Sequence, residues 1–266
     1  MENLTKLISE YSPAELSIIT KRRSSFDQEI LATVIDLANR GYIKNIKIED
    51  CIIGARIEAE KGDKDISSLK EYEKIVYLAF FKKGNIGTFK EFFKNFSIEK
   101  FQRSLFTYLK KEKGIYKINP YIIYIFFSFV LLIGGIIIIT HSKSLNFLSI
   151  FFTSILIITF PYLLIPNRTK KGEKIYKEAI NFKNIILQLK EEEINELICK
   201  DSDIFIKILP YSISFKIYKH WIEKFKNIDI KKPKWYHSVP PTNNFVKRLG
   251  KDLRALLFTI GARHSV

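Results

Sequence analysis

The chain contains little cysteine, and the two cysteines that occur lie far apart. Cys51 and Cys199 are the only ones among 266 residues. Neither belongs to a CxxC pair or to a Cys and His group with metal-ligand spacing, so the sequence excludes a disulfide framework and a structural zinc site. Reduced thiols are typical of the cytosol, and we expect that environment for both.

Recognisable catalytic motifs are also missing. The sequence has no nucleophile–base pair, phosphate loop, nucleotide fingerprint or metal cluster, so we expect a non-enzymatic protein with no cofactor and no evident small-molecule ligand. The alternative is a membrane enzyme that uses Glu191, Glu192, Glu193 and Glu196 with His220. Because adjacent carboxylates on a helix diverge in direction, a solvated helix face is the simpler interpretation.

Charge is absent from two long apolar runs in the middle of the chain. They are residues 120–140 (PYIIYIFFSFVLLIGGIIIIT) and 145–166 (LNFLSIFFTSILIITFPYLLIP), separated by HSKS. Each has the roughly 20 residues that a helix needs to cross a bilayer. Two buried helices of a soluble protein are the alternative, but such helices rarely lack charge over this length. The first residues, MENLTKLISE, lack the apolar region of a signal peptide. The pattern predicts a transmembrane helical hairpin.

Basic residues stand on both sides of these runs. The chain carries 44 Lys and Arg against 28 Asp and Glu, a formal net charge of +16. Positive residues near membrane segments stay on the cytoplasmic side. We therefore expect a two-pass cell-membrane protein with both termini cytoplasmic and a lipid bilayer as its first partner. The flanking basic residues are Lys110, Lys111, Lys113, Lys117, Arg168, Lys170, Lys171 and Lys174.

The segment before the apolar runs has the element order of a winged-helix module. A short helix over 13–20 precedes a second over 26–40, for which Ser25 and Gln28 form a capping box and Gly41 the C-terminal cap. Alternating residues then predict strands over 42–48 and 52–58. Further helices are expected over 68–82, with Ser67 or Ser68 as cap, and over 88–95 and 98–111.

Winged helices often bind DNA, which makes a membrane-tethered nucleic-acid regulator an alternative function. Asp27, Glu29 and Asp36 outnumber Arg40 on the helix that would read the groove. A groove-reading helix should present basic and amide side chains. Despite the basic triplet at residues 21–23, we expect protein contact rather than duplex binding.

The segment after the apolar runs is expected to be helical. The spacing of apolar residues predicts one amphipathic helix over 173–197. Residues 203–226 interleave large apolar side chains with lysines, which suits a helix in the headgroup layer and a core helix almost equally. Pro210 predicts a kink or a new helix start. An extended stretch over 232–236, a linker and a weak basic helix over 245–266 complete the chain. The candidate interaction or packing residues are Pro210, Tyr211, Trp221, Phe225, Trp235 and Tyr236.

Six short strings, taken in order, resemble one family. They are Ser12–Glu15, Ile35–Ile43, Arg168–Gly172, Leu209–Ile213, Trp221–Phe225 and Pro233–Tyr236. Together they make the chain similar, over about residues 12–236, to the C-terminal membrane and cytoplasmic part of the DUF2207 family. The resemblance implies a bacterial membrane protein of unknown function, in which a signal peptide and a β-rich extracytoplasmic domain precede this part. Lys216 stands where the family has glycine, and no catalytic residue is implied.

The sequence therefore predicts a mainly α membrane protein built on a two-helix hairpin. A winged-helix-like module would occupy residues 1–118, the hairpin 119–166, a helical cytoplasmic module 167–238, and a linker with a basic tail 239–266. The expected role is that of a protein-interaction or scaffold unit with an unidentified protein partner.

Overall fold

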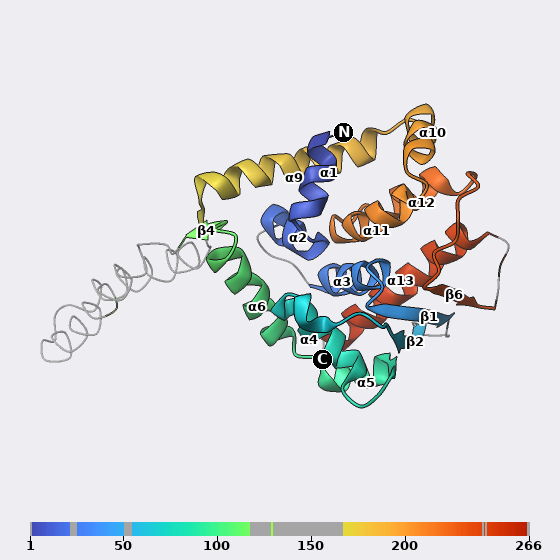
Figure 1. The fold of residues 1–266 in the computed structure, drawn as a ribbon, viewed down its shortest axis with the longest axis horizontal. Coiled ribbons are helices and arrows are strands. Elements are labelled where there is room, and N and C mark those ends of the chain that lie inside the picture. Colours follow the sequence, from blue (N-terminus) through green and yellow to red (C-terminus); the bar gives the residue numbers. More distant parts are fainter. Residues whose placement is uncertain are drawn as a thin grey trace, which may run out of the picture. The chain divides into compact units, whose positions relative to one another are not determined.

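The computed structural model describes residues 2–21, 26–50, 55–117, 129, 167–240, 242 and 244–264. Two compact units emerge, one formed by Met1–Tyr108 with Ile175–Val266 and one by Leu109–Lys174. The first unit draws on residues from both sides of the apolar runs (Figure 1).

Helices make up most of the described chain, and short strands are placed among them (Figure 1). Before the apolar runs the elements are α1 (Glu2–Glu10), α2 (Pro13–Lys21), α3 (Asp27–Asn39), β1 (Ile43–Asp50), β2 (Ala55–Lys61), the 3-10 turn η1 (Ile66–Ser68), α4 (Glu71–Phe81), β3 (Ile86–Thr88), α5 (Phe89–Asn95), α6 (Ile98–Lys111) and β4 (Tyr116–Lys117). After them come β5 (Asn167–Arg168), α9 (Lys170–Gln188), α10 (Glu191–Lys200), α11 (Ile204–Ser214), α12 (Tyr218–Phe225), β6 (Tyr236–Val239) and α13 (Phe245–His264).

A mixed sheet of four strands lies in the first unit, in the order β3-β2-β1-β6. β1 and β2 are antiparallel, with Ile48 opposite Ile57. β6 runs parallel to β1 on its other edge, and Ile48 pairs there with Ser238. Since β6 follows β1 by nearly 200 residues, the sheet cannot form until both halves of the chain have come together.

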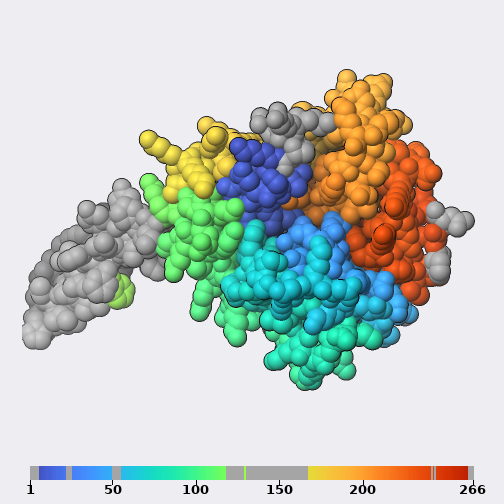
Figure 2. All heavy atoms as spheres, viewed as in Figure 1, coloured from blue at the N-terminus to red at the C-terminus, as the bar shows by residue number. Residues whose placement is uncertain are grey.

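Helix α3 is the centre of the first unit. It packs against α2, α4, α11, α13 and β1. Most of its residues are buried, including the polar Glu29 and Thr33. α13 adds Leu249, Leu253, Leu256 and Ile260 to the same core. Residues before and after the apolar runs also lie side by side on the surface, where blue and cyan segments adjoin orange and red ones (Figure 2).

The predicted fold class was wrong. The described part is a mixed fold in which a four-stranded sheet is packed among the helices, and none of its helices is long and apolar enough to cross a bilayer. The two predicted spans, 120–140 and 145–166, lie outside the described residues. The error has a physical origin: period-2 alternation indicates strands but not their partners. No strand was predicted at β6, which lies between the end of the expected extended stretch over 232–236 and the start of the expected linker at 239.

The winged-helix interpretation is not supported either. A wing is a hairpin with free edges, whereas β1 and β2 are flanked by β6 and β3. The helix proposed for groove reading, α3, is enclosed by other elements and cannot enter a groove. Its Glu29 is fully buried, so this acidic residue is part of the core.

Several local predictions were confirmed, whereas other predicted helix boundaries differ from those in the structure. The helix over 98–111 has the predicted bounds. The long helix expected over 173–197 is divided into α9 and α10, which starts where the Lys190 amide donates to Glu193. Pro210 lies inside α11, and the chain bends later, at 215–217. Helix α4 begins after Lys70 rather than after Ser67 or Ser68, and the expected cap Ser25 lies outside the described residues.

Candidate functional site

The C-terminal end of α3 contacts several other elements of the first unit. Gly41, with a φ of 82°, ends the helix in a Schellman motif. The Gly41 amide donates to the Ala38 carbonyl and the Tyr42 amide to the Leu37 carbonyl. A left-handed φ of this kind favours glycine because it has no Cβ. The two residues just before Gly41 belong to different sites. Arg40 is part of a buried charge network, and Asn39 lines a cleft.

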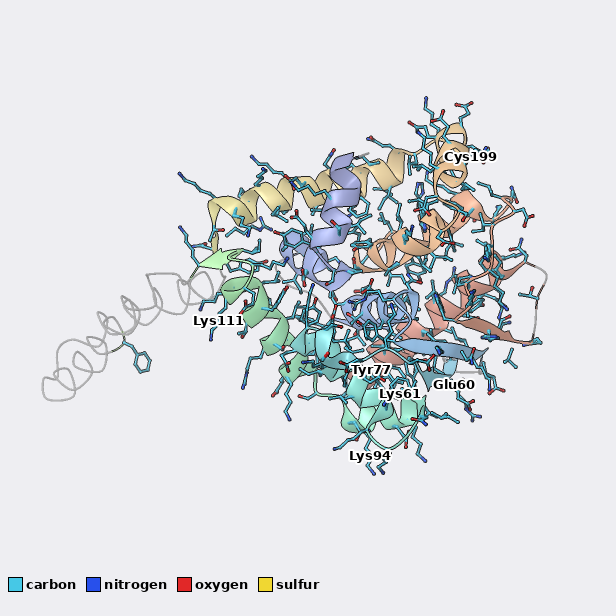
Figure 3. The ribbon with its side chains drawn as sticks, viewed as in Figure 1. Glu60, Lys61, Tyr77, Lys94, Lys111 and Cys199 are labelled. Carbon is cyan, nitrogen blue, oxygen red and sulfur yellow. The ribbon has the colours of Figure 1, made fainter. Side chains whose placement is uncertain are left out.

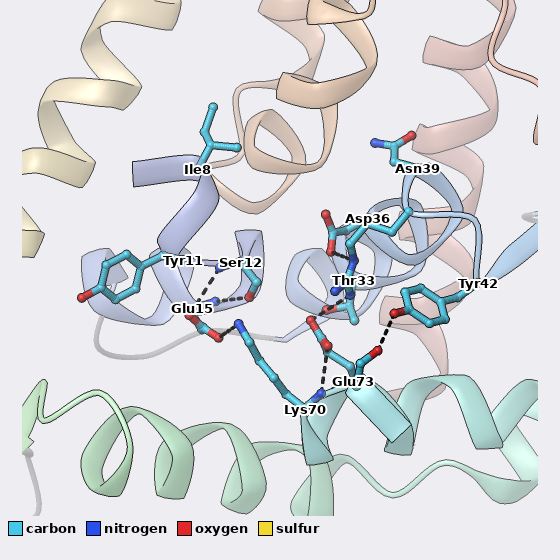
Figure 4. Close-up of polar contacts among 12 residues, drawn as sticks. Ile8, Tyr11, Ser12, Glu15, Thr33, Asp36, Asn39, Tyr42, Lys70 and Glu73 are labelled. Carbon is cyan, nitrogen blue, oxygen red and sulfur yellow. Dashed lines mark hydrogen bonds and ion pairs between the residues drawn. The ribbon is translucent and has the colours of Figure 1, made fainter. Parts of the chain in front are cut away.

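The buried charge network begins at Glu15 on α2, which is 0% exposed (Figure 4). Its carboxylate accepts hydrogen bonds from Tyr72 Oη at 2.6 Å and from Lys70 Nζ at 2.5 Å, and from the Ser12 amide at 3.3 Å. A buried carboxylate is costly without such partners. The three donors therefore explain why an acidic residue is tolerated inside a helix packing interface.

Arg40 extends the network between α3 and α4. Its Nε lies 3.0 Å from Asp36 Oδ2, and its terminal nitrogen 2.9 Å from Glu73 Oε1. Burial raises the pKa of Asp36 to about 6, with a further upward contribution from Glu73, and nearby Arg40 offsets only part of this. One arginine thus pairs with two carboxylates, and the pKa of one of them, Asp36, is raised to about 6.

Two further carboxylates are buried, and the contacts around the first tie the halves of the chain together. Glu29 lies 3.5 Å from Lys21 Nζ. The single Ser17 hydroxyl hydrogen is shared between the Glu29 carboxylate and the Ser214 carbonyl oxygen, which lies 3.0 Å from Ser17 Oγ. Burial lowers the pKa of Lys21 to about 8, against the opposing effect of Glu29. These contacts join α2 and α3, before the apolar runs, to the end of α11, after them.

Asp252 on α13 is the second of these carboxylates. It accepts a hydrogen bond from the Tyr236 hydroxyl at 2.6 Å, and Arg248 Nε lies 2.9 Å from its other oxygen. The contact fixes the start of β6 against α13. Burial is the main cause that raises the pKa of the Tyr236 phenol above its ordinary value, so this hydroxyl remains a donor at neutral pH.

A basic cleft lies on the other side of the α3 terminus, with a volume of about 580 Å³. Its walls come from the end of α3, the start of β1, the start of α11 and the segment before β6. Asn39 stands in its wall, donating to the Ile206 carbonyl and accepting from the Trp235 indole, each at 2.7 Å. The basic cleft is lined by Ala38, Asn39, Gly41, Ile43, Lys44, Asn45, Asp203, Ile206, Lys207, Lys231, Lys232, Pro233, Lys234 and Trp235.

A second groove, of about 920 Å³, crosses β1, β2, α5 and α13. Its lining combines apolar side chains such as Phe93 and Val239 with charges of both signs, among them Arg56 and Glu58. Phe258, next to the lining residue Thr259, is 57% exposed. We refer to this as the mixed groove. Exposed aromatic side chains beside paired charges are typical of protein-binding surfaces.

The basic residues that flank the apolar runs lie in the second unit. β4 and β5 pair antiparallel there, Tyr116 with Arg168 and Lys117 with Asn167. Arg168 is turned inward, with a side chain 7% exposed near Glu173. The other residues of the set are exposed or half-buried: Lys110, Lys111, Lys113, Lys117, Lys170, Lys171 and Lys174.

The same unit explains the Arg168–Gly172 string. Thr169 Oγ1 donates to the Gly114 carbonyl at 2.7 Å and accepts from the Gly172 amide at 3.0 Å, which caps α9. A Cβ at Gly172 would lie 2.3 Å from the Ile115 carbonyl oxygen. The chain thus favours glycine where the first turn of α9 passes the Ile115 carbonyl.

The candidate interaction or packing residues are buried. Tyr211 donates from its hydroxyl to the Ile8 and Tyr11 carbonyls, which anchors the N-terminal helices. Trp221 stacks on Phe205 and donates to its carbonyl at 3.2 Å. Of the six, Trp235 contributes to the basic cleft and the others to the core: Pro210, Tyr211, Trp221, Phe225 and Tyr236.

The residues weighed as an acid–base group have structural contacts. Glu193 accepts from the Lys190 amide at 2.8 Å, and His220 Nε2 lies 2.9 Å from the Leu187 carbonyl oxygen. Within the ranges that the structure describes, no three His, Cys, Asp or Glu side chains are close enough together to hold a metal ion.

Sequence reasoning missed the basic cleft and most of the buried charges. The cleft lysines come from separate segments, Lys44 before the apolar runs and the others after, so no local pattern unites them. Glu15 and Glu29 carried a signal that we did not use: each is an acidic residue among apolar ones on a short helix.

Several of the strings that carried the resemblance contain residues that connect distant elements of the fold. These residues are Glu15, Asn39, Tyr211 and Trp235. The family model described as predicted membrane protein (DUF2207), C-terminal domain, matches residues 9–225. The chain belongs to this family. No curated protein and no solved structure matches it. A DUF2207 member is a predicted membrane protein of unknown function, so a more specific role has to come from the geometry.

Proposed function

We propose that this DUF2207 chain is a non-enzymatic membrane protein whose first unit lies on the cytoplasmic face and acts by binding a protein partner. The shared core carries the proposal. Residues before and after the apolar runs interlock in one sheet and through buried or partly buried hydrogen bonds, such as those from Ser17 to Ser214 and from Trp235 to Asn39. Because one core cannot assemble from segments on opposite sides of a bilayer, both halves must lie on the same side.

The second unit supports the same conclusion for the chain near the apolar runs. The β4–β5 pairing brings Lys117 and Asn167 together, so the chain leaves and returns at one place. Exposed lysines on both sides of this pair favour the cytoplasmic face.

Thiol labelling in intact cells tests the placement. Cys199, exposed on α10, reports on the half after the apolar runs once Cys51 is replaced by serine (Figure 3). Lys83→Cys, at an exposed turn in a chain without native cysteines, reports on the half before them. We expect a membrane-impermeant maleimide to label both only after permeabilisation. Labelling of either reporter from outside would contradict the proposal.

The mixed groove is the surface that we assign to the protein partner. A photocrosslinking residue at Phe258, the exposed aromatic that precedes the lining residue Thr259 in the chain, should give a discrete adduct in cells. The same residue at Lys251, an exposed position on the same helix, serves as the control. Equal yields from both positions, or none from Phe258, would overturn the assignment. A nucleic-acid role has no comparable support, because α3 is enclosed in the core.

A further inference from the structure

The basic cleft differs in charge from the rest of the chain. Its lining has five lysines and one acidic residue, Asp203, whereas the whole sequence has 44 basic and 28 acidic residues. Two of the lysines form ion pairs with acidic residues that do not line the cleft: Lys44 with Asp63 and Lys207 with Asp201. These two acids reduce the excess of positive charge but do not remove it.

The remaining three lysines come from one short segment. Lys231, Lys232 and Lys234 are exposed, and Lys232 lies 5.6 Å from the ring centre of Tyr236. Among the described residues none of the three makes an ion pair. Pro233 is buried between them and the Trp235 carbonyl accepts from the Ile46 amide at 2.6 Å, so the segment is fixed against β1.

The shape of the basic cleft suits a small molecule. Its volume of about 580 Å³ lies within the range of about 300–1,000 Å³ that is usual for ligand pockets. Ile43, Ile206 and Trp235 give it apolar walls, and the lysines surround them. This combination accommodates a ligand with an anionic group and an apolar or sugar-like part.

The cations favour phosphate over carboxylate as the anionic group. All five are lysines, and the lining contains no arginine. Several ammonium groups around one cleft suit an anion with more than one charge and several acceptor oxygens. A phosphate group carries up to about two negative charges on three acceptor oxygens, whereas a carboxylate has a single charge on two oxygens. Lysine is also depleted at the cores of protein interfaces, which disfavours an acidic protein segment as the occupant.

We propose that the basic cleft binds a phosphate group, carried by a small phosphorylated molecule or by a phospholipid headgroup. The site is separate from the mixed groove assigned to the protein partner, and it goes beyond the function proposed above. Lys231, Lys232 and Lys234 would provide the charge, and Asn39 and Trp235 the wall.

Titration of the full chain in phosphatidylcholine nanodiscs tests this proposal, with inorganic diphosphate as the first probe. We expect saturable binding that weakens as salt is added, because exposed charges are screened. The triple change Lys231→Ala, Lys232→Ala and Lys234→Ala should weaken binding at least about tenfold, since three charge-assisted contacts are lost. A Lys→Arg triple should restore it.

A matched control removes the same charge elsewhere. Lys200→Ala, Lys219→Ala and Lys251→Ala alter exposed lysines outside the basic cleft, and should leave the affinity within about twofold. Asp203→Asn removes the acidic residue from the lining and should tighten binding by about threefold, a gain that misfolding cannot produce.

Two more probes identify the source of the phosphate. If short-chain phosphatidylglycerol binds through the three lysines and short-chain phosphatidylcholine does not, the ligand is a lipid headgroup. If only diphosphate binds, the ligand is a soluble molecule. Absence of binding by both phosphate probes, equal loss in the two triple variants, or tighter binding of hexaglutamate would each overturn the proposal. None of these results alters the thiol-labelling test of membrane placement.

Discussion

Trp235 donates its indole hydrogen to Asn39 Oδ1 at 2.7 Å, which joins residues 196 positions apart in the chain. The amide nitrogen of Asn39 donates in turn to the Ile206 carbonyl at 2.7 Å. One side chain therefore connects α3 to two segments that follow the apolar runs. This contact is a direct test of whether the two halves form one cooperative core.

Asn39→Ala should destabilise the first unit by about 2 kcal/mol, because it leaves a buried indole N–H and a carbonyl without partners. Urea unfolding of the purified full chain in detergent measures the change. Asn195→Ala, at an exposed position of α10, should stay within about 0.5 kcal/mol of the wild type. A double-mutant cycle with Trp235→Phe should give a coupling energy of about 1 kcal/mol. Additive effects would show that the two halves are not linked here.

Lys216→Gly should stabilise the protein by about 1 kcal/mol. Lys216 has a φ of 63° and ends α11 in the same Schellman motif that Gly41 provides for α3. The Lys216 amide donates to the Ile213 carbonyl and the Ile217 amide to the Ser212 carbonyl. A residue with a Cβ is strained in this left-handed conformation, which favours glycine.

Two controls separate backbone strain from charge in this experiment. Lys216→Ala removes the same charge but keeps the Cβ, so it should not reproduce the gain. Lys251→Gly, in the exposed interior of α13, should instead cost about 1 kcal/mol. If thermal denaturation shows Lys216→Gly to be no more stable than Lys216→Ala, the strain argument fails.

Much of the local structure of this chain was predictable, and most of its tertiary structure was not. Apolar spacing located the helix over 98–111, and Gly41 marked the end of α3. No local pattern in the sequence identifies β6 as the parallel partner of β1. None shows that Glu29 contacts Ser17 and Lys21. The burial of Glu15 and Glu29 could not be predicted either, because burial depends on contacts between distant segments.

Glu15→Gln should destabilise the protein by about 3 kcal/mol, since it leaves the Lys70 ammonium partly buried without its counter-charge. The Tyr72 hydroxyl retains an acceptor in the amide oxygen, so the effect reports the charge more than the hydrogen bond. Glu71→Gln breaks the exposed pair with Lys74 and should cost less than about 1 kcal/mol. Chemical denaturation compares them, and equal effects would show that Glu15 is not a buried ion-pair partner.

Gly172→Ala should loosen the second unit, although alanine normally stabilises a helix by about 1 kcal/mol relative to glycine. The new Cβ would lie 2.3 Å from the Ile115 carbonyl oxygen, which accepts from the Thr169 amide. Hydrogen exchange in the peptides that contain Ile115 and Thr169 should become faster. Gly84→Ala, with open space around its Cβ, is the matched control. Unchanged exchange would mean that α9 can move away from Ile115 without cost.

Asp36 should make stability fall as the pH rises from about 4 to about 6. Its pKa in the folded protein is raised from 3.8 to about 6, mainly by burial, so the folded state binds more protons than the unfolded state in this window. Stability linked to this group is therefore fully present below pH 3.8 and lost above about 6.

Asp36→Asn removes that dependence, while Arg40 keeps Glu73 as its partner. Other buried carboxylates produce acid denaturation of their own, so the informative quantity is the difference between the two proteins. The free energy of unfolding of Asp36→Asn relative to wild type should increase steadily between pH 4 and pH 6 and then level off. A difference that is constant with pH would place the Asp36 pKa at its ordinary value and contradict the enclosure of this carboxyl between α3 and α4.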